Sequence, residues 1–327
     1  MRTWRSFALL SLCLATIASA TVWLSAAQRG GRPIDIPKVF RVPLEPSSGK
    51  SAGAPIRVGL DNSDREGSPS WSPDGRELAF ATGSIISIVS SDTGQRREVH
   101  PDLDWVRSVG LTTLSWSPDR RFLLIDGGTG PDGTARPKGA YRVDASTGEA
   151  TMVVSKPVNP ASVSLTKGLP NGHAVIYLDK WQAVVVRDLE AGDERILYEA
   201  GTSLALDSLA LSPDGQSAAF RAHGKGDVDV LSLAGGPPRT VVTIRGPRDP
   251  AAAVTWSADG GFLIYSHQET KDGPFGLWRV GVAGGTPERL GLESNTEISA
   301  VVARPGGREL AVVMRVPAAS NASSGAR

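Results

Sequence analysis

Short apolar runs recur along most of this chain, and each follows a turn made of polar residues, Pro and Gly. The clearest runs lie at residues 78–80, 122–125, 174–177, 262–265 and 310–313. They show little alternation of polar and apolar positions, which predicts strands covered on both faces. Further strand-like runs follow each of them and are separated by turns that contain Gly. The pattern therefore predicts an all-β fold built from many short strands.

One turn motif repeats at a nearly constant interval. It reads Trp71-Ser72-Pro73-Asp74-Gly75 and returns at residues 116–120, 211–215 and 256–260, with degenerate copies at 169–172 and 304–307. The last residues of the six copies are separated by 45, 52, 43, 45 and 47 positions. Ser, Pro, Asp and Gly in this order suit a type I turn. We call these six segments the anchor turns and expect their Asp residues to be structural, and their Trp residues to wedge between repeats.

Each interval has room for four antiparallel strands, which is the size of a β-propeller blade. The last copy supplies only two strands, 298–303 and 309–315, and the N-terminal part supplies two more, 39–42 and 56–58. Joining them completes a sixth blade and removes an exposed sheet edge. The predicted fold is a six-bladed β-propeller over residues 37–316, with the last blade closed by N-terminal strands. An open all-β solenoid is the alternative.

Composition agrees with a fold rich in hairpins. Gly and Pro account for 37 and 23 of the 327 residues, well above the roughly 12% of average usage. The repeat places most of this excess in turns and blade-linking loops. An apolar content of 40% with eight Trp argues against disorder, and the single Cys13 leaves no intrachain disulfide and no Cys-based zinc site.

The segment Trp71-Ser-Pro-Asp-Gly-Arg-Glu-Leu-Ala-Phe80 resembles the repeat of TolB-type β-propellers, which is related in architecture to the WD40-like repeat. The resemblance covers residues 37–316, which is nearly the whole of the predicted mature chain. It implies a propeller fold but little about activity, because propellers serve as binding proteins and as enzymes. TolB carries an α/β domain before its propeller, for which residues 28–36 leave no room, so contacts made through that domain are not carried over.

The N-terminal segment has the features of a secretory signal peptide. Arg2 and Arg5 precede an uncharged apolar run over residues 7–27, which ends in small residues. We predict a signal peptide at residues 1–27 and a periplasmic or secreted protein; an uncleaved membrane anchor is the alternative. Removing this segment changes the formal charge from +1 to −1. A near-neutral chain predicts no nucleic-acid partner.

Strand direction sorts the loops onto two faces of the predicted propeller. The anchor turns and the Gly-containing turns lie on one face, and longer, irregular polar loops lie on the other. We call the second the variable-loop face and expect it to bind, because loops on a rigid scaffold carry recognition. The candidate binding residues there are Asp102, Asp104, Trp105, Arg107, His223, Asp227, His267 and Glu269.

Those residues support a contact surface better than a catalytic or metal site. Trp105 and Arg107 are residue types that anchor interfaces. His223 and His267 occupy nearly equivalent positions in adjacent repeats and lie near carboxylates, a combination that could hold a metal or do acid–base work. Polar loops are normal in repeat proteins, so we predict no catalytic residue, no metal and no cofactor. The tail at residues 317–327 is predicted to be disordered.

Three functions remain open from the sequence. The leading hypothesis is an exported propeller that docks a protein or peptide on its variable-loop face. The second is a lyase or hydrolase with its site at the channel mouth, acting on a saccharide or a small ester. The third is a structural propeller descended from a larger sensor or protease. The sequence leaves the partner and the oligomeric state open.

Overall fold

The computed structural model describes residues 35–60, 65–104, 106, 113–126, 139–155, 163–201, 205–222, 225–246 and 253–317. The predicted signal peptide lies outside these residues, and so does the predicted tail apart from Pro317, which ends the last strand. Ile36–Val316 forms one compact unit, described here by itself.

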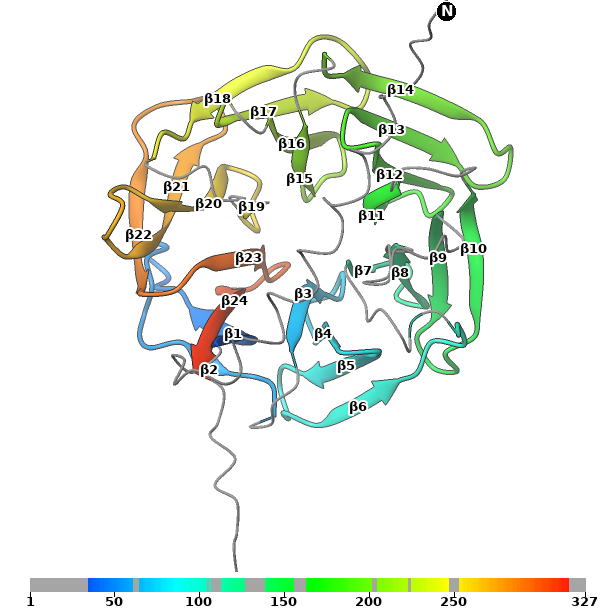
Figure 1. The fold of residues 1–327 in the computed structure, drawn as a ribbon, viewed down its shortest axis with the longest axis horizontal. Coiled ribbons are helices and arrows are strands. Elements are labelled where there is room, and N and C mark those ends of the chain that lie inside the picture. Colours follow the sequence, from blue (N-terminus) through cyan, green and yellow to red (C-terminus); the bar gives the residue numbers. More distant parts are fainter. Residues whose placement is uncertain are drawn as a thin grey trace, which may run out of the picture. The chain divides into compact units, whose positions relative to one another are not determined.

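Six four-stranded sheets surround a common axis, as Figure 1 shows. Blades 1 to 5 follow the chain, and all their strands pair antiparallel. Blade 1 is β3 (Glu66–Trp71), β4 (Glu77–Thr82), β5 (Ile85–Ser90) and β6 (Arg96–Val99). Blade 2 is β7 (Ser115–Trp116), β8 (Phe122–Asp126), β9 (Gly139–Asp144) and β10 (Ala150–Ser155). Blade 3 is β11 (Val163–Gly168), β12 (Ala174–Asp179), β13 (Ala183–Asp188) and β14 (Glu194–Glu199). Blade 4 is β15 (Leu206–Leu211), β16 (Ser217–Ala222), β17 (Asp227–Ser232) and β18 (Arg239–Thr243). Blade 5 is β19 (Val254–Trp256), β20 (Phe262–Gln268), β21 (Phe275–Gly281) and β22 (Glu288–Ser294).

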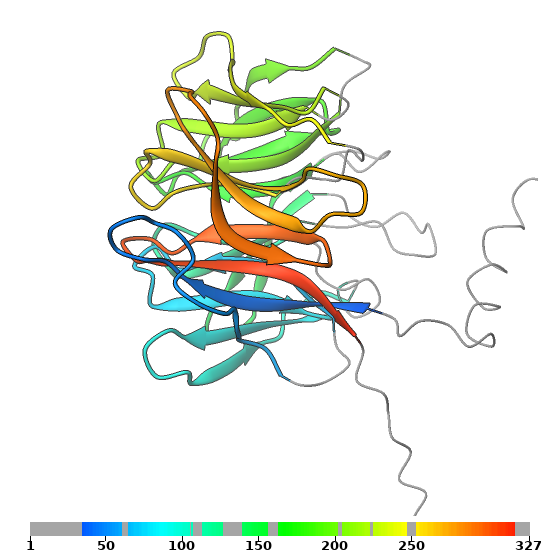
Figure 2. The same cartoon turned by 90° about the vertical axis from the view of Figure 1, so that its left-hand side faces the viewer.

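Blade 6 closes the ring with strands from both ends of the compact unit. Its order is β2-β1-β24-β23, with β23 (Ile298–Ala303) innermost and β24 (Glu309–Pro317) beside β1 (Asp35–Pro43) and β2 (Ile56–Arg57). Figure 2 shows β1 and β24 running side by side. The predicted six-bladed, all-β architecture and its closure by N-terminal strands are confirmed.

The anchor turns form because their side chains satisfy the turn from within. In blade 1, the Ser72 hydroxyl donates to Asp74 Oδ1 (2.7 Å) and accepts from the N–H of Glu77 (2.9 Å), while Asp74 Oδ1 also accepts from the N–H of Arg76 (3.2 Å). Gly75 has a φ of 68°, a left-handed value that favours Gly. The same hydrogen bonds recur in three further copies, at Ser117–Asp119, Ser212–Asp214 and Ser257–Asp259. The structural role predicted for these Asp residues is therefore confirmed.

The three anchor Trp residues pack between blades, as predicted. Trp71, Trp116 and Trp256 are buried and share apolar clusters with residues of the preceding blade. The Trp256 indole N–H also donates to the carbonyl of Ala210 in blade 4 (3.0 Å). Each indole therefore joins one blade to the one before it, which gives the ring a continuous core.

A second contact between blades was not anticipated from the sequence. An arginine at or near the start of an outer strand reaches a turn carbonyl of the following blade in three places. The pairs are Arg97 with Ala145 (2.5 Å), Arg195 with Leu233 (2.8 Å) and Arg239 with Val282 (2.6 Å). Charge-assisted hydrogen bonds of this kind connect neighbouring blades at the outside of the ring.

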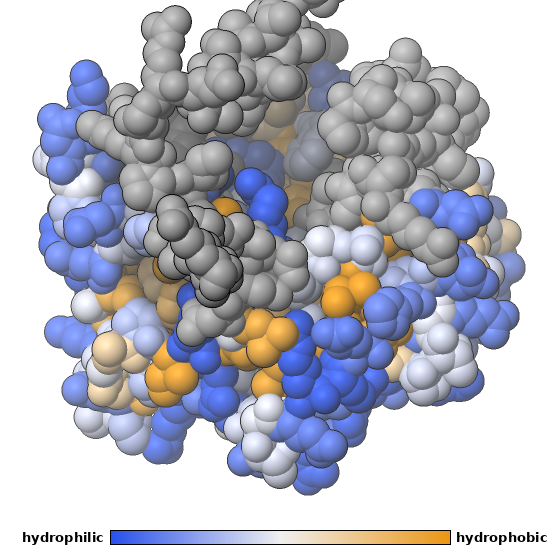
Figure 3. Space-filling model, turned by 60° about the horizontal axis from the view of Figure 1, so that its bottom comes forward, coloured by the Kyte–Doolittle hydropathy of each residue, from blue (hydrophilic) through white to orange (hydrophobic). Residues whose placement is uncertain are grey.

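One face of the propeller has a surface of mixed polarity (Figure 3). On the face shown in Figure 3, hydrophilic residues predominate and hydrophobic residues form small, separate patches. Within the described part of the chain, no helix is long and apolar enough to cross a membrane.

Candidate binding site at the mouth of the central channel

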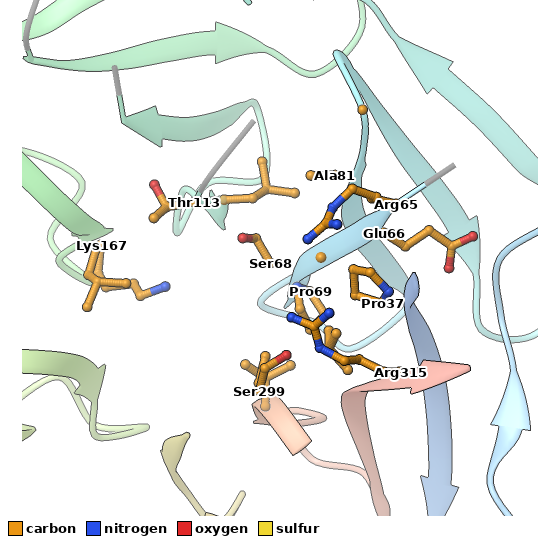
Figure 4. Close-up of a pocket in the computed structure, with 17 residues that line it drawn as sticks. Pro37, Arg65, Glu66, Ser68, Pro69, Ala81, Thr113, Lys167, Ser299 and Arg315 are labelled. Carbon is orange, nitrogen blue, oxygen red and sulfur yellow. The ribbon is translucent and has the colours of Figure 1, made fainter. Parts of the chain in front are cut away.

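A cavity of about 490 Å³ lies where the inner strands of four blades begin. Arg65 precedes β3 and Thr113 precedes β7, while Lys167, Ser299 and Arg315 belong to β11, β23 and β24. Figure 4 shows their side chains around the cavity. The anchor turns follow the opposite ends of the inner strands, so the cavity opens on the variable-loop face.

The inner strands are irregular where they line the cavity. β3 and β11 each carry a β-bulge, between Gly67 and Ser70 and between Ser164 and Lys167. Within these bulges Ser68 and Leu165 have φ values of 50° and 56°. A positive φ costs free energy for any residue with a Cβ, and such conformations concentrate at functional sites, where a bulge redirects side chains. Both strained residues line the cavity.

Thr166 and Lys167 are neighbours at the β11 bulge, but their side chains have different roles. The Thr166 hydroxyl donates to the Asp126 carboxylate at the end of β8, and the Thr166 N–H donates to Asp126 Oδ2 (3.2 Å). The Thr113 hydroxyl donates to the same oxygen (2.5 Å). Asp126 is buried, so these bonds fix blade 3 against blade 2. Lys167 comes next in the chain and lines the cavity.

The Lys167 ammonium has no hydrogen-bonding partner among the described residues. Burial lowers its pKa, and the Asp126 carboxylate opposes that shift. Figure 4 shows the Lys167 side chain directed into the cavity, with the guanidinium groups of Arg65 and Arg315 on the far wall. The cavity therefore presents cationic groups from two opposite sides.

Glu66 is the acidic residue in the described part of the lining, yet its carboxylate does not face the cavity (Figure 4). Figure 4 shows the carboxylate directed away from it. One oxygen accepts from Lys38 Nζ (3.1 Å) and the other from the N–H of Val39 (3.0 Å). The Glu66 charge is thus balanced behind the cavity wall, and it does not neutralise the cations that face the cavity.

The predicted binding residues that can be placed lie away from this cavity. Asp102 and Asp104 lie in the connection that leaves β6, where the Asp102 N–H donates to the carbonyl of Gly148 in blade 2 (2.9 Å). Asp227 begins β17 and accepts from the hydroxyl of Thr243 (2.6 Å). None of the three lines the cavity. Trp105, Arg107 and His223 lie outside the described residues.

His267 and Glu269 line a second, smaller pocket of about 250 Å³ in blade 5. Arg289 is paired there with Glu269 and lies 5.1 Å from the centre of the Trp278 ring, which His267 meets edge-on at 6.0 Å. Burial lowers the pKa of His267, Glu269 opposes this shift, and Arg289 adds to it. Glu269 and His267 thus make their contacts with residues of their own blade. Across the described ranges, no group of three or more His, Cys, Asp or Glu is placed to hold a metal ion.

The segment Gly49-Lys50-Ser51-Ala52-Gly53 has the Gly-x-Ser-x-Gly spacing of a hydrolase nucleophile turn, which the sequence analysis missed. It lies in the connection between β1 and β2, and the Ser51 hydroxyl donates to the carbonyl of Gly53 (3.1 Å). A nucleophile turn requires a strand that leads into a helix. Here two antiparallel strands flank the segment, so the match is one of spacing alone.

The cavity lysine also escaped the sequence analysis. Lys167 precedes a degenerate anchor turn, Leu169-Pro170-Asn171-Gly172, where the repeat is hardest to align. The signal that could have found it is a charged residue in an innermost strand, because inner strands surround the axis of a propeller.

Fold and site together define the class: this is a six-bladed β-propeller, similar in fold to TolB, with a cationic cavity at one mouth of its central channel. No protein-family model matches the sequence, and no curated protein matches it significantly. Among solved structures, the putative TolB from Agrobacterium tumefaciens aligns with a TM-score of 0.63 at 17% identity, over 87% of this chain and 99% of that one.

Two further structures share the fold. TolB from Acinetobacter baumannii aligns with a TM-score of 0.58 at 20% identity, over 87% of this chain and 71% of that one. An oligogalacturonate lyase in complex with manganese aligns with a TM-score of 0.52 at 15% identity, over 84% of this chain and 78% of that one. At these identities the similarity establishes the architecture and leaves activity to the site itself.

Proposed function

We propose that this protein is an exported β-propeller that docks a protein or peptide partner on its variable-loop face, around the mouth of the central channel. The observation that carries the proposal is the cavity of about 490 Å³ between the inner strands of blades 1, 2, 3 and 6. The signal-peptide pattern of residues 1–27 and the TolB-type fold support a periplasmic or secreted location.

The two faces of the ring differ in what their polar groups are used for. On the anchor-turn face, the Ser and Asp side chains of four turns are bonded within their own turns. On the variable-loop face, the side chains of Lys167 and Arg65 form no hydrogen bond or ion pair with described residues. Polar groups left without protein partners at a concave site are the ones that recognise a ligand. The variable-loop face is therefore the better docking surface.

Site-specific photocrosslinking tests the choice of face. A photoreactive phenylalanine analogue placed at Ser299, an exposed position in the cavity lining, should form adducts with the partner in the cell envelope. The matched control is the same analogue at Gln216, which is exposed beside the anchor turn of blade 4. Adducts from Gln216 but not from Ser299 would place docking on the anchor-turn face and would contradict the proposal.

A lyase or hydrolase with its site at the channel mouth is the second candidate. The observation that favours it is Lys167, because a lysine with a lowered pKa inside a cavity is a candidate general base. The shared fold with an oligogalacturonate lyase makes acidic oligosaccharides the first substrates to assay. Turnover that is lost in Lys167→Met would favour the enzyme, and turnover that persists in it would place any activity elsewhere.

A further inference from the structure

Cationic side chains outnumber acidic ones in the described lining of the central cavity. Its described lining holds three cationic side chains, those of Arg65, Lys167 and Arg315, and one acidic side chain, Glu66. Glu66 forms a buried ion pair with Lys38 and is directed away, as Figure 4 shows. A concave site lined by charges of one sign concentrates the potential and attracts a ligand of the opposite sign.

Lys167 adds to this imbalance, because no described group forms a hydrogen bond with its ammonium. The nearby Asp126 carboxylate is bonded to Thr113 and Thr166 and acts on the lysine only at a distance. Holding a partly buried ammonium group without a hydrogen-bond partner is costly, and an anionic ligand would reduce that cost. We propose that the central cavity is an anion site that binds a carboxylate group, with Lys167 and Arg65 as its principal cationic ligands.

The lining favours a carboxylate attached to an aliphatic chain over an inorganic anion. Leu114, Leu165 and Val302 add apolar surface, and the hydroxyl of Ser299 adds a hydrogen-bond donor. The volume of about 490 Å³ falls within the range of small-ligand pockets. Guanidinium and ammonium groups bind carboxylates through strong charge-assisted hydrogen bonds, and an inorganic ion would leave the apolar wall uncovered.

If the carboxylate belongs to a docked partner, this inference rests on the proposed function. If the carboxylate is a free small molecule, the inference is independent of it. The same chemistry is present in an acidic side chain of a docked peptide and in a free dicarboxylate. Two probes separate these sources: glutarate, and an N-acetylated peptide that contains two Glu residues. Inorganic phosphate serves as a third probe, because it carries charge without an aliphatic chain.

Isothermal titration calorimetry with each probe tests the site. Lys167→Met and Arg65→Gln should each weaken binding of glutarate or of the peptide by about tenfold or more. The control is Lys50→Met, which removes one positive charge at an exposed position between β1 and β2. Melting curves confirm that each variant is folded, and Arg65, being exposed, provides a variant with little risk to the fold.

Each outcome decides something. Binding of either carboxylate that depends on Lys167 and Arg65 supports the site, and the preferred probe identifies the source. Binding of neither, affinity unchanged in both variants, or phosphate bound as tightly as the carboxylates would overturn it. Photocrosslinks from Ser299 without carboxylate binding would leave the docking function standing and remove the anion site. Carboxylate binding without photocrosslinks would support the anion site and count against docking on this face.

Discussion

Lys38 of β1 and Glu66 of β3 form a buried ion pair across the closure of the propeller. Lys38 Nζ lies 3.1 Å from Glu66 Oε1, and both side chains are almost completely excluded from solvent. The second carboxylate oxygen accepts from the N–H of Val39 (3.0 Å), and Lys38 also donates to the carbonyl of Leu60 (3.2 Å). The pair therefore joins blade 6, which combines N-terminal and C-terminal strands, to blade 1.

Removing one partner of this pair should destabilise the ring. Glu66→Gln leaves the Lys38 charge buried without a counter-charge, which costs about 3–5 kcal/mol in comparable cases. Chemical denaturation measures the change in the free energy of unfolding. The matched control is Glu288→Gln, which breaks the more exposed pair with Arg279 and should cost less than about 1 kcal/mol. Equal losses from the two variants would show that the closing pair has no special role.

Trp256 should contribute more through its indole N–H than Trp116 does. The two rings are equally buried, but only Trp256 has a hydrogen-bond partner for that group in the described structure, the carbonyl of Ala210. Trp256→Phe should therefore destabilise the protein by about 1 kcal/mol more than Trp116→Phe, as measured by denaturant titration. The opposite order would mean that packing differences outweigh the hydrogen bond.

Lys167 should make the protein less stable at neutral pH than it would be without the amine. Burial lowers its pKa, so between the lowered pKa and 10.5 the unfolded chain binds more protons than the folded one. The free energy of unfolding therefore rises with pH across that window, and the full penalty is present below it. Lys167→Met should raise the melting temperature at pH 7, with a gain that shrinks as pH rises. A loss of stability at every pH would contradict this.

The turn that follows β9 should hold a carboxylate of unusually low pKa. The hydroxyl (2.6 Å) and N–H (2.8 Å) of Ser146 and the N–H of Thr147 (3.0 Å) donate to Asp144 Oδ1 and lower its pKa from 3.8 to about 2. The stabilisation it gives is present above pH 3.8 and is lost as pH falls through 2. Ser146→Ala should raise the pKa of Asp144 in an NMR titration. Asp188, whose pKa is lowered by the N–H groups of Ala191 and Glu190, should not change.

The repeat was predictable because its determinants are local. Ser72 and Asp74 satisfy their own turn, so the same short motif produces the same hairpin wherever it occurs. The interval between copies then fixes four strands per blade, and the two strands missing from the last copy require closure by the N-terminal pair. The three arginines that join neighbouring blades were visible as residues, but their partners depend on how outer strands tilt across the next blade.

The candidate site was less accessible to sequence reasoning. Asp102 and Asp104 belong to a polar connection, yet the position of Asp102 follows from a backbone hydrogen bond to blade 2. His267 and Glu269 share a pocket, but with Arg289 and Trp278 of their own blade. Polarity along the chain identifies residues that face solvent, and it carries no information on which of them converge.

By itself the sequence determined the all-β class, the six blades, the anchor turns and the shared last blade, because each follows from turn chemistry and from the repeat interval. Only the tertiary structure decided that Arg65 and Lys167 line the same cavity. They are distant in the chain, and they come together because inner strands of different blades surround one axis and a bulge in β11 leaves Lys167 in the channel. The physical reason is that closing the ring converts several unrelated strand ends into a single cavity.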